Sequence, residues 1–298
     1  MATKNLFLKR DVKEKRALVN IEIDRYLPRK DEYPKQIHKA LRHTLFAGGK
    51  RNRPYLLVNT YKIFSDENMK EVYKVAGVIE ILHSYTLMHD DLPPIDNDDY
   101  RRGKKAAHIE HGENIALLAG DGLLVYAFKF LAEIDIDKSI KNQLLKELAQ
   151  AAGHQGLIAG QIVDIESEGK DVSEKTLKYI HKNKTGKLIN LAIRFGCYLA
   201  NAPEEDRKNL EKYGEKIGLA FQIVDDILDI EGDKETLGKS VGKDKASQKA
   251  TFPAIYGLQK SREKAKKLLD EAADLLKKYG SKAKTLRMIT DYIYTRKF

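Results

Sequence analysis

Apolar residues recur every three to four positions along most of the chain, with polar residues between them. This period is typical of α-helices that bury one face. It predicts helices over 37–45, from 52 onward, 72–91, 117–131, 140–165 and 174–199, two between 203 and 232, and one or two after 252. No hairpin pattern and no repeat of fixed period is found. The sequence therefore predicts a single all-α domain over 1–298, in which 1–30 forms an N-terminal helix and linker.

Glycine, proline and capping residues mark the ends of these helices. Gly48-Gly49 follows the first one, and Asn52 with Pro54 suits the first turn of the next. Pro93-Pro94 ends the helix that reaches about residue 91. Asp171 to Glu174 has the spacing of a capping box before the helix that reaches about residue 199.

Composition supports a folded helical chain with an excess of positive charge. The 298 residues are 42% hydrophobic and include only seven prolines, and 54 Lys+Arg against 44 Asp+Glu give a net charge of +10. A basic chain suggests nucleic acid as a partner, but most of these cations are lysines that alternate with acidic residues, as in 264–274. That pattern is typical of an exposed helix face. We therefore expect no nucleic-acid partner.

Other classes are excluded by what the sequence lacks. Cys197 is the only cysteine, so we expect neither a disulfide framework nor a thiolate zinc site, and we interpret this residue as structural. The first residues have no long apolar segment typical of a signal peptide. The most apolar stretch, 115–130, contains Asp121 and falls short of the 18 to 20 apolar residues of a membrane span. These features predict a cytoplasmic protein without a membrane span.

The segment 219–230 differs from the other helices because it is apolar around most of its circumference and carries one polar stripe. The stripe has the spacing i, i+3, i+4 and i+7, and consists of Gln222, Asp225, Asp226 and Asp229. Three like charges on such a helix repel one another and are costly to desolvate unless cations neutralise them. The pattern predicts that the stripe lines a cavity.

A second acidic cluster is Asp90-Asp91-Leu-Pro-Pro-Ile-Asp96-Asn-Asp-Asp. On an uninterrupted helix Asp90 and Asp96 would lie about 240° apart and could not share a ligand. The proline pair breaks the helix, so we expect the later carboxylates to swing back toward Asp90 and Asp91. Two polar residues precede Asp90 by one and two turns on the same stripe: Thr86 and His83.

Carboxylate oxygens are hard ligands that suit Mg²⁺, which is usually completed by water and phosphate oxygens. The sequence therefore predicts a diphosphate held by Mg²⁺ between two groups of aspartates. Basic segments occur at 48–54, 101–105 and 239–249, where they can bind phosphate, and arginine suits bidentate contacts. The first segment lacks the spacing of a P-loop.

These motifs, together with Lys184-Thr185-Gly186 and Gly160-Gln161-Ile-Val-Asp164, resemble those of the short-chain trans-polyprenyl diphosphate synthases. The resemblance covers roughly 35–298. The Asp-Asp-x4-Asp spacing of the first cluster is similar to that of the bacterial farnesyl diphosphate synthases. The resemblance implies an all-α isoprenoid-synthase fold around a central cavity, a homodimer and three Mg²⁺ ions per active site.

The resemblance also implies a role for each matching residue. The expected metal ligands are Asp90, Asp91, Asp96, Asp225, Asp226 and Asp229. The residues expected to bind the allylic diphosphate are Arg101, Lys184, Thr185, Gln222, Lys239 and Lys249. Those expected to bind isopentenyl diphosphate are Gly49, Lys50, Arg53, His83 and Arg102, with the basic tail 294–298 close by. Catalysis is expected to depend on Asp90, Asp91, Asp96, Arg101, Lys184 and Asp225.

The implied reaction is a head-to-tail condensation of isopentenyl diphosphate with dimethylallyl and geranyl diphosphates, through ionisation, alkylation and proton loss. In the family, the residue five before the first aspartate, here Tyr85, commonly limits the length of the product, and Thr86 lies beside it. An aromatic ring there implies farnesyl diphosphate, with geranylgeranyl diphosphate as the alternative. Helical geometry places Tyr85 about 140° from Asp90, so this expectation comes from the resemblance.

Three other classes share part of the pattern. A class I terpene cyclase would normally have an Asn/Ser/Glu-type second metal motif, which the second aspartate cluster does not match. A non-catalytic synthase subunit tends to lose aspartates that are present here. A diiron bundle needs two Glu-x-x-His motifs and further glutamates, whereas only Glu80 to His83 has this spacing.

Overall fold

The computed structural model describes residues 2–231 and 251–295. Helices dominate this part of the chain, which confirms the all-α prediction. The chain forms two compact units, one from 1–58 and 67–145 and the other from 59–66 and 146–298. The predicted single domain stays a prediction.

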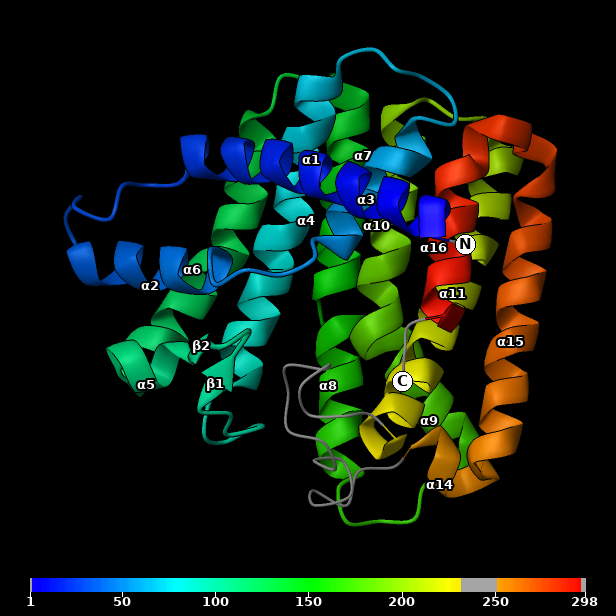
Figure 1. Cartoon of the computed structure of the whole chain (residues 1–298). Coiled ribbons are helices and arrows are strands. Elements are labelled where there is room, and N and C mark those ends of the chain that lie inside the picture. The colour runs from blue at the N-terminus through cyan, green and yellow to red at the C-terminus, as the bar shows by residue number, and fades with distance from the viewer. Residues whose placement is uncertain (1, 232–250, 296–298) are drawn as a thin grey trace. The chain divides into compact units, whose positions relative to one another are not determined.

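The first unit is built around α4, whose neighbours are α6 and α1 (Figure 1). Its elements are α1 (Ala2–Tyr26), α2 (Lys35–Leu45), α4 (Met69–Asp90), β1 (Tyr100–Arg101), β2 (Lys104–Lys105), α5 (Ala107–His111) and α6 (Glu113–Glu133). Two helices contribute to both units: α3 (Asn52–Tyr61) and α7 (Lys138–Ala152). The buried side chains of α4 include Val75, Ile79 and Leu82, which follow the predicted period.

Helix α6 packs on α4 with both small and large residues. Ala119, Gly120 and the large Phe130 are buried, whereas Leu117 and Val125 are exposed. The sequence predicted the helix but not which of its faces is buried, because apolar residues occur almost all around it.

A short hairpin is present, although the sequence shows no hairpin pattern. Strands β1 and β2 pair antiparallel, with Tyr100 opposite Lys105 and Arg101 opposite Lys104. The turn residues Arg102 and Gly103 both have positive φ, 55° and 77°, as a type I′ turn requires. The strands are two residues long and lack an alternating pattern, so periodicity could not reveal them.

The second unit is organised around α11, which packs against α10 and α15 (Figure 1). Its elements are α8 (Leu157–Glu166), α9 (Glu174–Ile180), the π-helix η1 (His181–Gly186), α10 (Lys187–Leu199), α11 (Glu204–Glu231), α14 (Phe252–Tyr256), α15 (Leu258–Leu275), the 3₁₀ segment η2 (Lys277–Ala283) and α16 (Lys284–Thr295). The N-cap of α9 is Ser173, whose hydroxyl accepts a hydrogen bond from the backbone N–H of Thr176.

Two predicted helix boundaries are wrong. The helix expected over 140–165 is interrupted between α7 and α8, where a turn forms around Gly153 and Gly156. Glycine favours such a break because it is a poor helix former. Conversely, the two helices expected between 203 and 232 are one helix of 28 residues, α11, because no proline or capping motif interrupts it.

Candidate active site

The first aspartate cluster lies in the loop after α4 and folds back on the end of that helix. The backbone N–H of Asp96 donates to the backbone carbonyl of Asp90 at 2.8 Å, and that of Asp98 to the carbonyl of Asp91 at 3.2 Å. These bonds bring Asp96 next to Asp90, as the proline break predicted. Both side chains are half-buried. The loop therefore holds the backbones of Asp90 and Asp96 side by side.

Asp91 points inward from this loop and is 2% exposed. Arg101 of β1 donates from Nε to Asp91 Oδ1 at 2.7 Å, and its Nη2 also bonds Asp98 Oδ2 at 3.0 Å. Burial raises the pKa of Asp91, and the bond and charge of Arg101 oppose this rise. Burial alone would lower the pKa of Arg101, but Asp91 and the neighbouring aspartates raise it. The hairpin is thus attached to the aspartate loop through a charged Arg101.

His83 lies on α4 within a group of arginines. It is half-buried, and Thr86 Oγ1, which donates to the His83 carbonyl, lies 3.5 Å from His83 Nδ1. Burial lowers the pKa of His83 well below its usual value, and the charges of Arg53 and Arg102 lower it further. In the free protein His83 is therefore neutral, and its surroundings favour an anion.

Tyr85 is buried on another side of α4. Its ring makes an edge contact with His89, with centroids 5.0 Å apart and planes at 73°. His89 Nε2 is 3.0 Å from the carbonyl of Leu117, and the imidazole lies against Gly120, where an added Cβ would come within 2.0 Å of it. Burial, Asp90 and Asp121 raise the pKa of Tyr85, which keeps the phenol neutral.

In the second unit, the acidic stripe of α11 divides into two sets. Gln222, Asp225 and Asp229 are half-buried, whereas Asp226 is only 7% exposed. Asp226 Oδ2 accepts a hydrogen bond from the N–H of Phe252 at 2.9 Å and lies 3.6 Å from His181 Nε2. The carboxylate of Asp226 therefore joins α11 to the start of α14 and to η1.

Lys184 and Thr185 lie in the π-helix η1, a kind of local widening that often occurs at functional sites. Lys184 Nζ forms an ion pair with Asp164 Oδ2 of α8 at 2.6 Å. Gly160 of α8 packs on the same segment, where an added Cβ would lie 2.3 Å from the backbone N of Lys184. The pair and the close packing fix the ammonium group relative to α8.

The remaining expected residues lie partly outside and partly inside the described part of the chain. Lys239, Lys249 and the last three residues of the basic tail lie outside the described residues. The expected isopentenyl diphosphate residues Gly49, Lys50 and Arg53 lie in the segment between α2 and α3 and at the start of α3. The spacing of residues in the sequence assigns no role to Asp98 or His181, and Asp164 enters only as the last residue of the motif that begins at Gly160. Spacing alone does not reveal such partners.

The carboxylates of the two aspartate clusters suit a metal ion whose coordination is completed by water or phosphate oxygens. In the part of the chain that the structure describes, no group of three or more His, Cys, Asp or Glu side chains is arranged to hold a metal ion alone. The half-buried carboxylates of Asp90, Asp96, Asp225 and Asp229 nevertheless supply hard oxygen donors. Mg²⁺ keeps several waters and binds phosphate oxygens, so one or two carboxylates are enough protein ligands for it.

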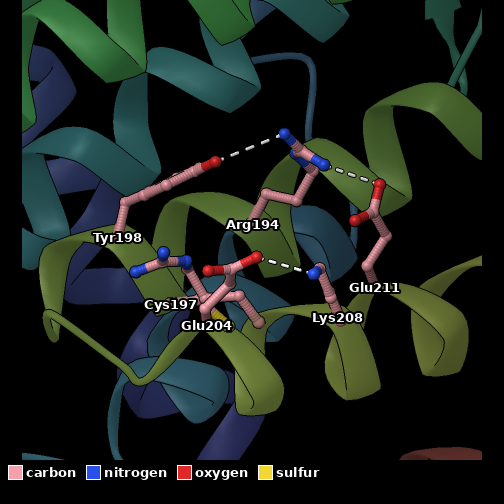
Figure 2. A pocket seen from close by; sticks show the side chains of 7 residues that line it. Arg194, Cys197, Tyr198, Glu204, Lys208 and Glu211 are labelled. Atoms are coloured by element: carbon pink, nitrogen blue, oxygen red, sulfur yellow. Dashed lines mark hydrogen bonds and ion pairs between the residues drawn. The ribbon is translucent and has the colours of Figure 1, made fainter.

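A separate pocket of about 210 Å³ lies in the second unit and contains none of the expected site residues. Figure 2 shows two ion pairs between its side chains: Arg194 bonds Glu211, and Lys208 bonds Glu204. Cys197 lines this pocket but is 1% exposed, and burial raises the pKa of its thiol to about 12. An un-ionised thiol is a weak nucleophile, which agrees with the structural interpretation of Cys197.

Helix α6 is long and apolar enough to cross a membrane by length and composition, within the residues that the structure describes. Asp121 interrupts the apolar stretch, and the sequence therefore predicts no membrane span. In the structure Asp121 lies within the helix, which packs against α4, α2 and α5.

Comparison with known proteins places this geometry in a family. The profile of the polyprenyl synthetase family matches residues 34–292. The farnesyl diphosphate synthase of Geobacillus stearothermophilus is 44% identical over 84% of this chain and 85% of its own length. The geranylgeranyl diphosphate synthase of Cyanophora paradoxa is 41% identical over 95% of this chain and 94% of its own length.

Solved structures agree with these sequence matches. An FPP/GFPP synthase from Zymomonas mobilis superimposes with a TM-score of 0.88 and 34% identity, over 98% of this chain and 100% of that one. A geranyltransferase from Helicobacter pylori, complexed with magnesium and isoprenyl diphosphate, superimposes with a TM-score of 0.86 and 28% identity. This match covers 98% of this chain and 97% of that one. These likenesses confirm the isoprenoid-synthase fold. The chain belongs to the polyprenyl synthetase family of prenyltransferases.

Proposed function

We propose that the protein condenses isopentenyl diphosphate with dimethylallyl and geranyl diphosphates and releases farnesyl diphosphate. The observation that carries this proposal is the aspartate loop, in which Asp96 folds back on Asp90 while Asp91 holds Arg101 beside them. This arrangement combines metal ligands with a fixed guanidinium, which is the combination that a departing diphosphate needs. Relatives at 38–44% identity named farnesyl diphosphate synthase support the product assignment.

Mg²⁺ is the proposed cofactor, with three ions per active site as the family resemblance implies. Asp90 and Asp96 from one cluster and Asp225 and Asp229 from the other would supply oxygen ligands, and the substrate diphosphate would complete them. When bound, the metal neutralises charge on the diphosphate. Asp91 and Asp226, which belong to the ligands that the resemblance implies, would act through the protein groups that they hold.

The cationic side chains have defined tasks in this proposal. Arg101, Lys184 and Thr185 bind the allylic diphosphate, together with Gln222, and stabilise the charge that develops on it as the allylic C–O bond breaks. Arg53, Arg102, His83 and Lys50 hold isopentenyl diphosphate so that its double bond attacks the carbocation. The released diphosphate accepts the proton. No side-chain nucleophile takes part, in agreement with the raised pKa of Cys197.

The decisive experiment is a primer assay. The protein is incubated with Mg²⁺, isopentenyl diphosphate and, separately, the five-, ten- and fifteen-carbon allylic diphosphates, and the products are sized. We expect rapid elongation of the first two primers and slow elongation of the third. Failure to elongate any primer would contradict the enzyme assignment. If the fifteen-carbon primer reacts as fast as the ten-carbon one, geranylgeranyl diphosphate is the product.

Product length is proposed to depend on Tyr85. Its buried ring packs against His89 and, in this proposal, occupies volume that a longer prenyl tail would need. Replacing the ring by a methyl group in Tyr85→Ala should therefore shift products to twenty carbons or more. An unchanged product length in this variant would show that the limit lies elsewhere.

We further propose that the protein is a cytoplasmic homodimer. Helix α6 exposes a face with Leu117, Leu118 and Val125, which are 47%, 58% and 67% exposed. Exposed apolar side chains that gather on one helix mark an interaction surface, and the exposed Asp121 lies among them. A second copy of the chain would cover this face, which also accounts for its membrane-like composition. Cell fractionation should place the protein in the soluble fraction, and recovery with the membranes would contradict this localisation.

A further inference from the structure

A buried carboxylate, Glu80, joins two arginines near His83. Glu80 is 1% exposed and lies on α4, one turn before His83. Its Oε1 atom accepts a hydrogen bond from Arg51 Nη1 at 2.6 Å and lies 3.4 Å from Arg102 Nη2. Glu80 Oε1 therefore contacts two guanidinium groups, that of Arg51 in the segment after α2 and that of Arg102 in the hairpin.

Arg51 is fixed on every side. Its side chain is buried, Nε donates to Asn20 Oδ1 of α1 at 3.0 Å, and Nη2 donates to the carbonyl of Leu45. Its φ is 53°, a left-handed conformation that costs free energy for a residue with a Cβ. Such a conformation persists where surrounding contacts enforce it. One of these contacts is the ion pair with Glu80, in which both side chains are buried.

Arg102 is held in a similar way. Its φ is 55°, and Nη1 donates to the carbonyl of Gly48 at 2.7 Å. The guanidinium lies directly over Gly49, where an added Cβ would come within 2.6 Å of Arg102 Cζ. The lack of a side chain at Gly49 therefore makes room for Arg102, and Glu80 supplies the charge that attracts it.

The local charge leaves a site for an anion. Glu80 carries one negative charge against the positive charges of Arg51 and Arg102, and Arg53 adds a third positive charge close to His83. A buried carboxylate that orients two guanidiniums before the ligand arrives lowers the cost of binding, since less side-chain freedom is lost.

We propose that Glu80 is a positioning residue that holds Arg102 and the 48–53 segment in the conformation that receives isopentenyl diphosphate. Glu80 acts through these groups and does not contact the substrate. This inference rests on the proposed function, because that function identifies the anion. Nothing in it depends on the allylic site, so the effect of removing Glu80 should be confined to one of the two substrates.

The test is a steady-state comparison of Glu80→Gln with the wild type. Glutamine keeps the shape and loses the charge, so we expect KM for isopentenyl diphosphate to rise about tenfold or more while KM for geranyl diphosphate and kcat change less than about threefold. Glu80→Asp, which keeps the charge, should recover part of the loss. Equal changes in both KM values, or an unchanged KM for isopentenyl diphosphate, would overturn the proposal.

A matched control separates positioning from general loss of stability. Glu147→Gln removes a carboxylate from another partly buried pair, with Arg194 Nε at 2.9 Å, in the other unit. It should lower Tm without changing either KM. A double-mutant cycle of Glu80→Gln with Arg102→Lys should be non-additive in KM for isopentenyl diphosphate, because both changes remove the same interaction. Additive effects would show that Glu80 does not act through Arg102.

Binding measurements keep this test independent of the reaction. If Glu80→Gln does not fold, Glu80→Asp and Asn20→Ala, which removes the second partner of Arg51, are measured instead, and unchanged isopentenyl diphosphate affinity in both overturns the proposal. If the wild type condenses nothing, the proposed function fails. Calorimetric titration with inorganic diphosphate then still tests Glu80, and equal affinity of the wild type and Glu80→Gln would reject its positioning role.

Discussion

In each aspartate cluster, two aspartates that are adjacent in the sequence have different surroundings. Asp91 and Asp226 are buried, whereas the aspartate that precedes each of them is half-buried. Consecutive residues on a helix point about 100° apart, so both members of a pair cannot face the same ligand. The second aspartate instead binds protein groups, which are Arg101 in one cluster and the N–H of Phe252 in the other.

This difference predicts different phenotypes for Asp226→Ala and Asp225→Asn. Loss of the Asp226 carboxylate leaves the N–H of Phe252 unsatisfied, so we expect the free energy of unfolding to fall by about 1–3 kcal/mol. Asp225→Asn should leave Tm nearly unchanged and reduce kcat strongly. Thermal unfolding and turnover of both variants check this, and a stable Asp226→Ala with altered Mg²⁺ dependence would favour a ligand role.

The lowered pKa of His83 predicts a pH dependence of stability. The folded protein keeps His83 neutral, whereas an unfolded chain takes up a proton below about pH 6.5. The free energy of unfolding of the substrate-free protein should therefore fall as the pH drops through 6.5, by at most about 1.4 kcal/mol per pH unit from this group. This contribution is absent at higher pH, where both states are neutral.

Urea unfolding between about pH 5.5 and pH 7.5 measures this effect. His83→Gln should flatten the profile, while His154→Gln, at an exposed position, should leave it as in the wild type. His111 also has a pKa lowered by burial and by His43, so part of the slope should remain in each variant. An identical slope in His83→Gln and the wild type would contradict the prediction.

Among the helices, the sequence predicted those whose ends carry strong signals. Pro93-Pro94 and the Gly48-Gly49 pair mark real ends of α4 and α2, because proline and glycine act through the local backbone. The buried face of α6, the break before α8 and the two-residue hairpin depend on tertiary contacts, so periodicity could not supply them. The positions of Asp90 and Asp96 followed from the proline break, but their partners did not.

The contact between α8 and η1 yields a further prediction. In Gly160→Ala the new methyl group would collide with the backbone of Asn183 and Lys184, which cannot rotate away as a side chain can. The π-helix must then shift, so we expect destabilisation of about 1–3 kcal/mol and a loss of kcat of about tenfold or more.

The control is Gly122→Ala in α6. There an added Cβ meets side chains at 3.4 Å or more, which is ordinary contact, and alanine favours a helix by up to about 1 kcal/mol. This variant should therefore be as stable as the wild type or more so. Tm and kcat of the two variants are compared, and equal behaviour would mean that η1 tolerates displacement.

The assembly of the whole chain with a second copy is testable on the exposed face of α6. In Val125→Lys a charged side chain would have to be desolvated in the proposed dimer, so we expect monomers at concentrations where the wild type is dimeric. Light scattering after gel filtration measures the mass. Leu18→Lys, at an exposed apolar position on α1, is the control and should remain dimeric. A dimeric Val125→Lys would mean that another surface is used.

The tight turn of the hairpin has a consequence for how the sequence can change. Arg101 and Arg102 are neighbours in the chain, yet one bonds Asp91 and the other reaches Glu80 and Gly48. Because Arg101 ends strand β1 and Arg102 begins the turn, inserting or deleting a single residue before Arg101 would move both side chains away from these partners. A substitution at Arg101 or at Arg102 can therefore alter the contacts of one arginine alone, whereas a change in the length of the hairpin would disturb the contacts of both.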